Sequence, residues 1–252
     1  MARARAAIVT GGGRGIGRAI GLALAEEGRS VAVADLLADG AHAVAAEIVT
    51  AGGRAVAVEL DVTDQDSVRA GIDAAVSALG PLEILVNNAG WDELKPFTDT
   101  DEQFWERVLD VNFKGALRMI HALLPTMVAG GFGRIVSIGS DAGRVGSSLE
   151  SVYSGAKGGL IAFTKTIARE TARHGVTANT VCPGPTDTPM LAGIAAAGED
   201  ADRVIEAMTR AVPMRRLAKP EEIAAAVAFF ASERAGFITG QTLSVSGGLT
   251  MA

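Results

Sequence analysis

Seven short apolar segments recur along the chain, and stretches with the hydrophobic spacing of helices separate them. Each segment is rich in Val, Ile, Leu and Ala, and most are bounded by Gly, Asn or Asp. Such runs are typical of buried β-strands, whereas apolar residues spaced by three and four positions are typical of amphipathic helices. The expected strands are residues 6–10, 30–35, 55–60, 83–87, 133–139, 175–181 and 241–245, and the clearest helical patterns are residues 15–27, 38–51 and 221–231.

The regular alternation of these segments predicts the fold class. Because the strands are almost uniformly apolar, both faces of the sheet are expected to be covered by helices, as in parallel sheets. The sequence therefore predicts an α/β protein with a single doubly wound Rossmann domain, in which helices flank a seven-stranded parallel sheet. No linker or low-complexity tract divides residues 1–252. Residues 191–216 interrupt the alternation of strands and helices, and a long excursion at this point is expected to form a lid over a substrate.

Composition and charge exclude several classes of protein. The net charge is −6, and Arg and Lys are scattered without a basic stripe, so no nucleic-acid partner is expected. The longest apolar run, residues 223–231, is far shorter than the ~20 residues that span a bilayer, and the N-terminus lacks the long apolar region of a signal peptide. We therefore expect a cytoplasmic protein with no membrane partner.

The cysteine and histidine content argues against disulfides and metal sites. Cys182 is the only cysteine, so no disulfide can form within the chain and no cysteine-based zinc cluster is expected. The three histidines, His42, His121 and His174, are scattered without the spacing of metal ligands. The sequence therefore predicts no metal.

A glycine-rich loop follows the first expected strand and opens the first helix. Its sequence, TGGGRGIG, has the glycine spacing G-x-x-x-G-x-G. Glycines allow a tight turn and close approach of the backbone to a diphosphate, which the helix N-terminus attracts. The expected cofactor contacts in this loop are Gly11, Arg14, Gly15, Ile16 and Gly17. A purely structural turn is the alternative, because this motif alone is weak evidence.

Asp35 indicates which dinucleotide the loop binds. It ends the second expected strand, 18 residues after Gly17, close to the ~20 residues typical of a ribose-binding acid. Its carboxylate would accept hydrogen bonds from the ribose hydroxyls and repel a 2′-phosphate. No basic residue follows immediately, so the sequence favours NAD over NADP, although Arg14 could help to bind a phosphate. Capping of the next helix is the alternative role of Asp35.

Tyr153 is the only tyrosine in the chain, and Lys157 follows it four residues later. On a helix, positions i and i+4 lie on the same face, so the phenol and the ammonium could reach one shared point. Taken alone, such a pair is more often an exposed helix pair than a catalytic one.

Several short motifs in a fixed order resemble the short-chain dehydrogenase/reductase family over essentially the whole chain. Each motif is weak alone, but the combination is specific. The motifs are the loop from Thr10 to Gly17, Asp61-Val62, the sequence NNAG at residues 87–90, Asn112, Ser140, Tyr153-x-x-x-Lys157 and Pro183-Gly184.

The resemblance implies roles for individual residues. Asp61 would bind the adenine amino group beside the Val62 backbone, with helix capping as the alternative. Asn112 would hold a water against Lys157 through its backbone carbonyl. The resemblance also implies that the turn after the fourth strand lines the inner ribose and that the segment after the sixth strand contacts the nicotinamide. These cofactor contacts are Asn88, Ala89, Gly90, Pro183, Gly184, Thr186 and Thr188.

The same resemblance gives Tyr153 and Lys157 a chemical role. A phenol has a pKa near ~10, and a nearby ammonium and the positive nicotinamide ring favour its ionised form. Tyr153 would then exchange the proton of the substrate alcohol, while Lys157 also holds the nicotinamide ribose. Ser140 would hydrogen-bond the substrate oxygen. The implied reaction is oxidation of a secondary alcohol to a ketone with NAD.

Longer passages narrow the expected substrate. The sequences NNAGWD, SDAGRVGSS, VCPGPTDTP and SVSGGLTM resemble the branch of the family that oxidises 2-hydroxycyclohexanecarboxyl-CoA. We therefore expect a small-molecule alcohol or ketone substrate, specifically a ring-bearing or short 3-hydroxyacyl-CoA thioester. Trp91 could form an apolar wall, and Arg144 could meet a phosphate or another acidic group, with a surface salt bridge as the alternative.

Other functions stay open at this point. Within the family they are a 3-oxoacyl-carrier-protein reductase, against which Asp35 argues, and a cyclic-alcohol or sugar dehydrogenase. A nucleotide-binding sensor without catalysis is the alternative from another class. The resemblance also implies a homotetramer. The helix around Tyr153 is poor in charge and contains Gly155, Gly158 and Gly159, which suits an interface or a buried helix within one chain.

Overall fold

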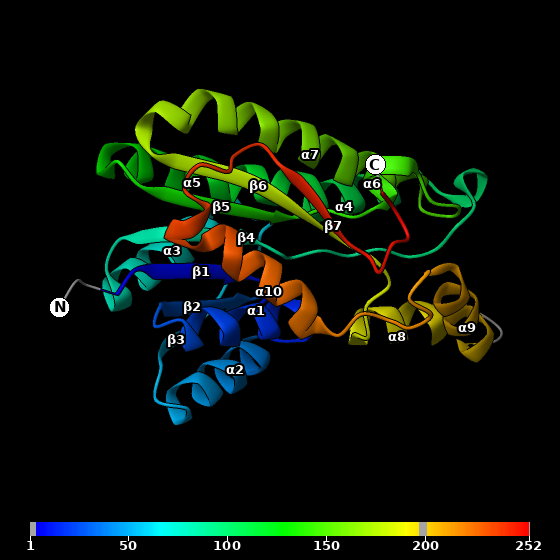
Figure 1. Cartoon of the computed structure of the whole chain (residues 1–252), viewed down its shortest axis with the longest axis horizontal. Helices are drawn as coiled ribbons and strands as arrows, with labels where there is room; N and C mark the ends of the chain where they lie inside the picture. Colours follow the sequence, from blue (N-terminus) through cyan, green and yellow to red (C-terminus); the bar gives the residue numbers. More distant parts are fainter. Residues whose placement is uncertain (1–3, 197–200, 252) are drawn as a thin grey trace.

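The computed structural model describes residues 4–196 and 201–251, which form one sheet of seven parallel strands between two layers of helices. The strand order is β3-β2-β1-β4-β5-β6-β7, which confirms the predicted fold class (Figure 1). The strands are β1 (Ala6–Thr10), β2 (Ser30–Asp35), β3 (Arg54–Glu59), β4 (Leu82–Asn87), β5 (Gly133–Ile138), β6 (Val176–Pro183) and β7 (Thr242–Val245).

Helices cover both faces of this sheet. Helices α1, α2 and α10 pack on one face, and α3, α5 and α7 pack on the other (Figure 1). The helices are α1 (Gly15–Glu26), α2 (Ala38–Thr50), α3 (Gln65–Leu79), α4 (Glu102–Leu109), α5 (Gly115–Gly130), α6 (Ala142–Val145), α7 (Ser151–Thr171), α8 (Pro189–Ala196), α9 (Ala201–Ala211) and α10 (Pro220–Ala231). Short turns of other helix types are η1 (Phe97–Asp99), η2 (Asp110–Lys114), η3 (Ala172–His174) and η4 (Glu233–Ala235).

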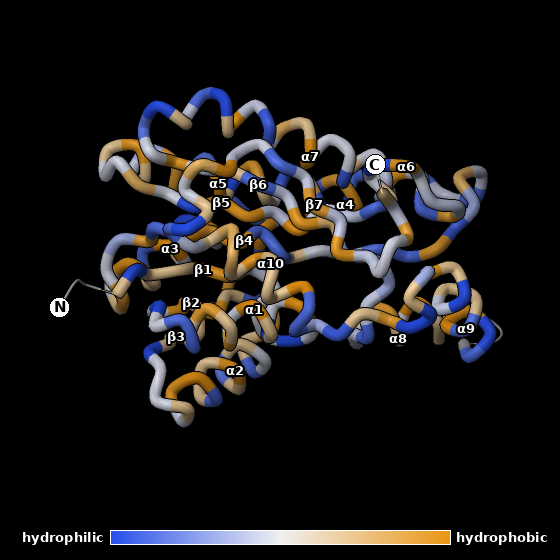
Figure 2. The backbone as a smooth tube through the Cα atoms, in the orientation of Figure 1, coloured by the Kyte–Doolittle hydropathy of each residue, from blue (hydrophilic) through white to orange (hydrophobic). Residues whose placement is uncertain are grey.

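The apolar strands form the centre of the hydrophobic core. Strands β1, β4 and β5 are buried almost throughout, because helices cover them on both sides. One apolar cluster lies between the sheet and α1, α2 and α10, and a second lies between the sheet and α3, α5 and α7. The hydropathy tube shows the same arrangement, with apolar strands inside and polar positions along the outer helices (Figure 2).

The expected strand boundaries agree with the structure to within two residues. The largest difference is at β6, which continues through Pro183, because the backbone of Pro183 still pairs with β7. Proline lacks a backbone N–H, so it is tolerated here at the end of the strand.

The strand order reverses between β1 and β4, which creates the crevice where open α/β sheets bind ligands. All seven strands are parallel, so their carboxyl ends meet at one edge of the sheet, called here the carboxyl edge. Helices α8 and α9 project beyond this edge (Figure 1).

In its described part, the excursion expected at residues 191–216 contains most of α8 and all of α9. Helix α8 begins at Pro189, slightly earlier than expected, and α9 ends at Ala211. Part of the expected lid, residues 197–200, lies outside the described residues. The chain returns to the sheet through a parallel bridge between Thr186 and Ala218, and the Met214 N–H donates to the Gly247 carbonyl over 3.2 Å.

Two kinds of feature are absent from the described stretches. No helix in residues 4–196 or 201–251 is both long and apolar enough to cross a membrane. In the same stretches, no group of three or more His, Cys, Asp and Glu side chains is arranged to hold a metal ion.

Candidate active site

The glycine loop between β1 and α1 is packed too closely for side chains. A Cβ atom at Gly17 would lie 2.0 Å from the carbonyl oxygen of Gly11, and one at Gly12 would lie 2.9 Å from Val33. Gly11 and Gly15 adopt φ angles of +61° and +53°, which glycine reaches without strain. The loop therefore needs glycine for its own geometry, and the small residues also leave its outer side open to a ligand.

The N-terminus of α1 fits a diphosphate. Arg14 occupies the N-cap position, and no side chain there satisfies the free N–H groups of the first turn. Its extended backbone leaves the helix dipole directed at the space beside the loop. Gly15 also lies close to the segment after β6, because a Cβ atom there would be 3.4 Å from the Thr188 methyl. The residues present therefore fit the diphosphate of a dinucleotide.

Thr10 and Asn88 join the glycine loop to the turn after β4. The Asn88 side-chain amide donates to the carbonyls of Thr10 and Gly11 over 2.9 and 3.0 Å. The Thr10 hydroxyl accepts the N–H groups of Asn88 and Ala89 over 3.0 and 3.1 Å. Both ligand-facing turns are thus fixed relative to each other. The sequence analysis named Thr10 only as the start of a motif and missed this role.

Asp35 lies beside the glycine loop, as the sequence predicts. Its carboxylate accepts the Gly13 N–H over 2.9 Å and the Leu37 N–H over 3.0 Å. The second bond closes a turn before α2. The N-cap of α2 is Leu37, and no side chain caps the first turn, so Asp35 does not have the alternative role of a helix cap. The exposed side chains that follow are Leu36 and Leu37, and neither carries a positive charge.

Asp61 does not cap α3. That position belongs to Asp64, whose side chain accepts the Asp66 N–H. Asp61 instead accepts the backbone N–H and the hydroxyl of Thr63 over 2.8 and 2.7 Å through Oδ1. Val62 packs beside Gly115, where a Cβ atom would lie 2.9 Å from the Val62 side chain.

Asn112 sits in the π-helical turn η2, which interrupts the continuous run from α4 to α5. Its side chain donates to the carbonyl of Trp91 over 2.6 Å and to that of Val108 over 2.9 Å, and it accepts the Trp91 N–H over 3.3 Å. A π turn widens the helix and alters its carbonyl directions, and such turns are frequent at functional sites. Asn112 therefore anchors the loop after β4.

Lys157 is buried on α7 and points into the centre of the site. Its Nζ donates to the Ile138 carbonyl over 2.9 Å and lies 5.5 Å from the centre of the Tyr153 ring. Burial lowers the pKa of Lys157 to about 8, partly opposed by the negative charge of Asp92. A small cavity of about 10 Å³ lies between Lys157, Asn112, Asn87 and Thr10. This volume is about enough for one water molecule, and several polar groups line the cavity.

Tyr153 and Ser140 come together from α7 and from the end of β5. A hydrogen bond with Ser140 lowers the pKa of the phenol, but burial raises it more, and the charges of Glu150 and Asp92 add to that rise. The expectation that Lys157 makes the phenol acidic is therefore wrong for the chain by itself. The physical reason is that desolvation of the phenolate and the charges of two nearby carboxylates outweigh the hydrogen bond with Ser140.

The segment after β6 turns back toward the glycine loop. Gly184 is pressed against Ser246, where a Cβ atom would lie 2.8 Å away, and its N–H donates to the Val245 carbonyl. The Thr186 hydroxyl donates to the Gly184 carbonyl over 2.9 Å. Thr188 accepts the Leu191 N–H over 3.2 Å, so its hydroxyl caps the first turn of α8. Pro183 ends the strand that leads into this segment.

Three acidic residues around the site were not among the residues proposed from the sequence. Asp92 and Asp141 are buried, and one carboxylate oxygen of each has no hydrogen-bond partner. Glu150 precedes α7. The sequence contained a signal, because Asp92 and Asp141 lie within the passages NNAGWD and SDAGRVGSS.

Trp91 and Arg144 were singled out in the same passages. Trp91 packs edge-on against Phe104 and under the Arg107 guanidinium, with which it makes a cation–π contact at 3.8 Å. Arg144 donates to the Ser244 hydroxyl over 2.6 Å, and that hydroxyl donates to Asp141. The half-buried Arg144 therefore joins α6 to β7 through this network.

Comparisons with known proteins agree with this geometry. Residues 11–250 match the family model described as Enoyl-(Acyl carrier protein) reductase. The chain is 42% identical over 247 residues to cis-4-hydroxycyclohexanecarboxylate dehydrogenase of Sinomonas cyclohexanicum, covering 98% of this chain and 96% of the relative. It is 39% identical over 252 residues to 3-oxoacyl-[acyl-carrier-protein] reductase FabG of Staphylococcus aureus, and each chain is covered completely.

A solved structure gives the same result for the fold. The crystal structure of an actinorhodin polyketide ketoreductase variant with NADPH matches with a TM-score of 0.94 at 34% sequence identity, covering 98% of this chain and 97% of the other. These matches extend over nearly the whole chain and include a dehydrogenase, a reductase and a ketoreductase whose structure contains NADPH. The chain therefore belongs to the short-chain dehydrogenase/reductase family and is an oxidoreductase.

Proposed function

We propose that the chain is an NAD-dependent dehydrogenase that oxidises a secondary alcohol to a ketone through Tyr153, Ser140, Lys157 and Asn112. The observation that carries the proposal is the convergence of these side chains at the carboxyl edge, beside a glycine loop that fits a diphosphate. The bound nicotinamide cofactor supplies the hydride acceptor. The residues of this chain position the alcohol and move its proton.

Tyr153 takes the alcohol proton in this proposal, and Ser140 hydrogen-bonds the substrate oxygen. The raised pKa of the phenol means that the chain alone holds Tyr153 protonated at neutral pH. Oxidation therefore requires the positive charge that comes with the oxidised cofactor, whereas the protonated phenol is already suited to donate in the reduction direction.

Lys157 and Asn112 complete the proton path. Lys157, with a pKa of about 8, can lose a proton near neutral pH. The cavity between it and Asn112 has room for one water, which could pass the proton on. The geometry thus supports the water-mediated role expected for Asn112.

The cofactor preference rests on Asp35. Its carboxylate lies at the loop beside Gly13 and would repel a 2′-phosphate, and no cation follows it. Asp35→Ala should lower the ratio of kcat/KM for NAD over NADP by about tenfold or more, since the ribose hydroxyls would lose a charged acceptor and a 2′-phosphate would no longer be repelled. Unchanged preference in steady-state assays with both cofactors would contradict this assignment.

The proposed substrate is a 2-hydroxycyclohexanecarboxyl-CoA or a related 3-hydroxyacyl-CoA thioester. The relatives support a ring-bearing substrate and an acyl substrate separately, because one is a hydroxycyclohexanecarboxylate dehydrogenase and another a 3-oxoacyl reductase. A 3-oxoacyl-carrier-protein reductase and a cyclic-alcohol dehydrogenase are the competing assignments. A screen of CoA thioesters, carrier-protein thioesters and free cyclic alcohols with NAD and NADP separates them by kcat/KM. Equal rates for thioesters and free alcohols would rule out the thioester assignment.

A nucleotide-binding sensor without catalysis is distinguished by one simple assay. NADH absorbance should rise when the protein is mixed with NAD and an accepted alcohol. Cofactor binding without any absorbance change across the whole panel, in both reaction directions, would favour the sensor.

We further propose that residues 191–216 close over the substrate.

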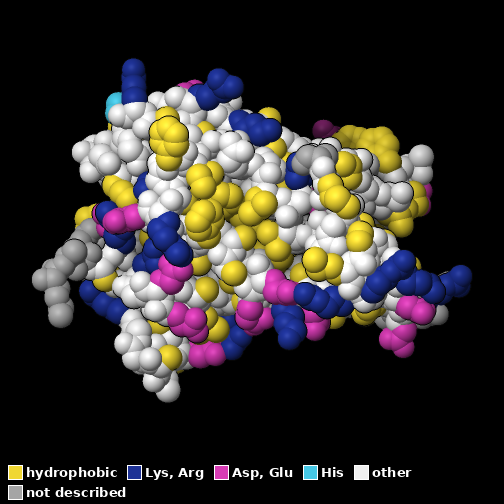
Figure 3. All heavy atoms as spheres, viewed as in Figure 1, with side chains coloured by type: hydrophobic (Ala, Val, Ile, Leu, Met, Phe, Trp, Pro, Cys, Tyr) yellow, Lys and Arg dark blue, Asp and Glu magenta, His cyan; other side chains and the backbone are white. Residues whose placement is uncertain are grey.

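We also propose that the single domain of residues 1–252 assembles as a homotetramer in the cytoplasm. Two observations support assembly. Edge strand β7 exposes Leu243, and Phe229 and Phe237 are exposed nearby, so hydrophobic side chains gather on the face over α10 and β7 (Figure 3). The glycines of α7 give weaker support to a subunit interface, because Gly158 contacts Gly143 and Gly159 contacts Phe113 of the same chain. Light scattering of the wild-type protein and of Leu243→Lys tests this assembly.

A further inference from the structure

The loop that carries Asp92 is held by Asn112 at one end and by the segment before α7 at the other. On one side, Trp91 exchanges two hydrogen bonds with the Asn112 side chain, at 2.6 and 3.3 Å. On the other, the Lys95 N–H donates to the Leu149 carbonyl over 3.0 Å. Leu149 adopts a φ of +68°, which branched residues rarely adopt, directly before Glu150. The structure thus holds Asp92 and Glu150 together beside the start of α7.

Asp92 has an unusual environment for a carboxylate. Its side chain is only 8% exposed, and the buried Oδ2 atom has no hydrogen-bond donor. Burial, followed by the charge of Glu150, raises the pKa of Asp92 to about 7, and the Glu150 carboxyl is close enough to share a proton with it. The backbone of Glu93 also hydrogen-bonds this carboxylate, but the Oδ2 atom stays without a donor. A buried carboxylate oxygen without a donor costs stability, so its presence at a site calls for a reason in function.

The electric field of this pair reaches the reacting centre. Both Asp92 and Glu150 raise the pKa of the Tyr153 phenol, and Asp92 also acts on Lys157. An anionic group bound next to Tyr153 would meet the same repulsion. Lys157 donates to the Ile138 carbonyl, and Arg144 donates to Ser244 in the network with Asp141.

We propose that Asp92 and Glu150 form an acidic subsite that admits a neutral acyl group beside Tyr153 and excludes a free carboxylate. This inference rests on the proposed function. In a 3-hydroxyacyl compound, the acyl carbon is two bonds from the carbinol carbon, so its group must lie within a few ångströms of the phenol. A thioester is neutral there, whereas the free acid places a negative charge against two carboxyl groups. The subsite therefore makes the enzyme select an activated acyl derivative, and the reaction that supplies its substrate must be one that leaves a thioester rather than an acid.

The test uses a matched pair of substrates, 2-hydroxycyclohexanecarboxylate and its methyl ester, which differ mainly in charge. The wild-type enzyme should oxidise the ester with a kcat/KM at least ~10-fold above that of the acid, because Asp92 and Glu150 repel the carboxylate of the acid at close range. Asp92→Asn and Glu150→Gln keep the shape of the side chains and should each reduce this ratio severalfold by improving oxidation of the acid. Similar ratios in the wild type and both variants, or a wild-type preference for the acid, would overturn the proposal.

Glu93→Gln serves as the control for the general loss of a negative charge. Glu93 lies on the same loop but pairs with Lys95 at 2.8 Å near the surface, so its removal should leave the ester-to-acid ratio unchanged. The wild-type ratio by itself tests the proposal if a variant fails to fold. If neither the ester nor any other alcohol is oxidised with NAD or NADP, the proposed function fails. If the ester is oxidised and the acid equally well, only the acidic subsite fails.

Discussion

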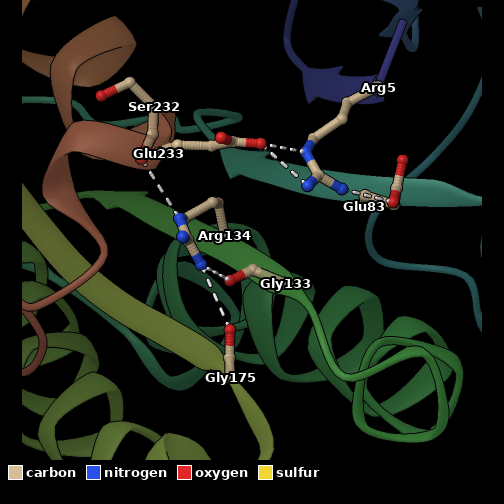
Figure 4. A network of polar contacts seen from close by, with 7 residues as sticks. All are labelled: Arg5, Glu83, Gly133, Arg134, Gly175, Ser232 and Glu233. Atoms are coloured by element: carbon tan, nitrogen blue, oxygen red, sulfur yellow. Dashed lines mark hydrogen bonds and ion pairs between the residues drawn. The ribbon is translucent and has the colours of Figure 1, made fainter. Parts of the chain in front are cut away.

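The two edges of the sheet differ in how their charged and amide side chains are partnered. At the edge where the strands begin, Arg5 donates to Glu83 over 2.7 Å and to Glu233 over 2.9 and 3.2 Å (Figure 4). The buried Arg134 donates to three carbonyls, those of Ser232, Gly133 and Gly175, at 2.8 to 3.3 Å. Both guanidinium groups also stack on the Phe132 ring, at 3.4 and 4.2 Å.

At the carboxyl edge, several buried polar atoms are left without partners. Among the described residues, the amide and carboxylate oxygens in this state belong to Asn87, Asp92 and Asp141, which all follow or end strands β4 and β5. The same edge holds a buried lysine with a depressed pKa. The first edge therefore stabilises the fold, while the second keeps polar groups available for a ligand at a cost in stability.

The largest effect is expected from Tyr153→Phe at the carboxyl edge. Loss of the phenol proton should lower kcat by about 10³-fold, the usual size for a general acid–base group, because Ser140 and Lys157 cannot replace it. Steady-state kinetics would measure the loss, and cofactor fluorescence with thermal melting would check that binding and folding persist. Turnover near the wild-type rate would contradict the catalytic role of Tyr153.

The next largest effect is expected from Arg134→Met at the opposite edge. Three backbone carbonyls would lose their donor, which should reduce the free energy of unfolding by about 2–3 kcal/mol. Urea denaturation would measure the change, while KM for cofactor and substrate should stay the same. A shift in KM without a loss of stability would show that the two edges do not divide their roles in this way.

A smaller effect is expected from Asp92→Asn, which should increase the free energy of unfolding rather than reduce it. Because the pKa of Asp92 is raised to about 7, the folded state binds more protons than the unfolded state between about pH 4 and 7, and stability from this group falls as the pH rises through that window. The variant should therefore be more stable than the wild type by on the order of 2 kcal/mol at pH 8 and nearly equal to it at pH 4. Denaturation at both pH values, with Glu93→Gln as control, would measure the difference. A pH-independent change would mean that the charge of Asp92 is not the cause.

The smallest effect is expected from Glu233→Gln. The Glu233 side chain is 73% exposed, so its ion pair with Arg5 is screened by water and should contribute less than about 1 kcal/mol. Urea denaturation at low and high salt would measure the contribution. A loss as large as that of Arg134→Met would show that the exposed carboxylate organises the whole network.

The catalytic set and the glycine loop could be predicted because each rests on local spacing. Tyr153 and Lys157 are four residues apart on one helix, and Gly11, Gly15 and Gly17 define one turn. The acidity of the phenol could not be predicted in the same way. It depends on Asp92, which lies some 60 positions earlier in the chain, and on burial that no local pattern shows.

The sequence by itself determined the seven strands, their parallel arrangement and the residue types at the carboxyl edge, because periodicity and turn residues act over a few neighbours. Only the tertiary structure decided which charges meet there. Asp92 and Glu150 come together because Asn112 and Leu149 hold two distant loops, and the resulting desolvation and repulsion depend on distances in space rather than along the chain.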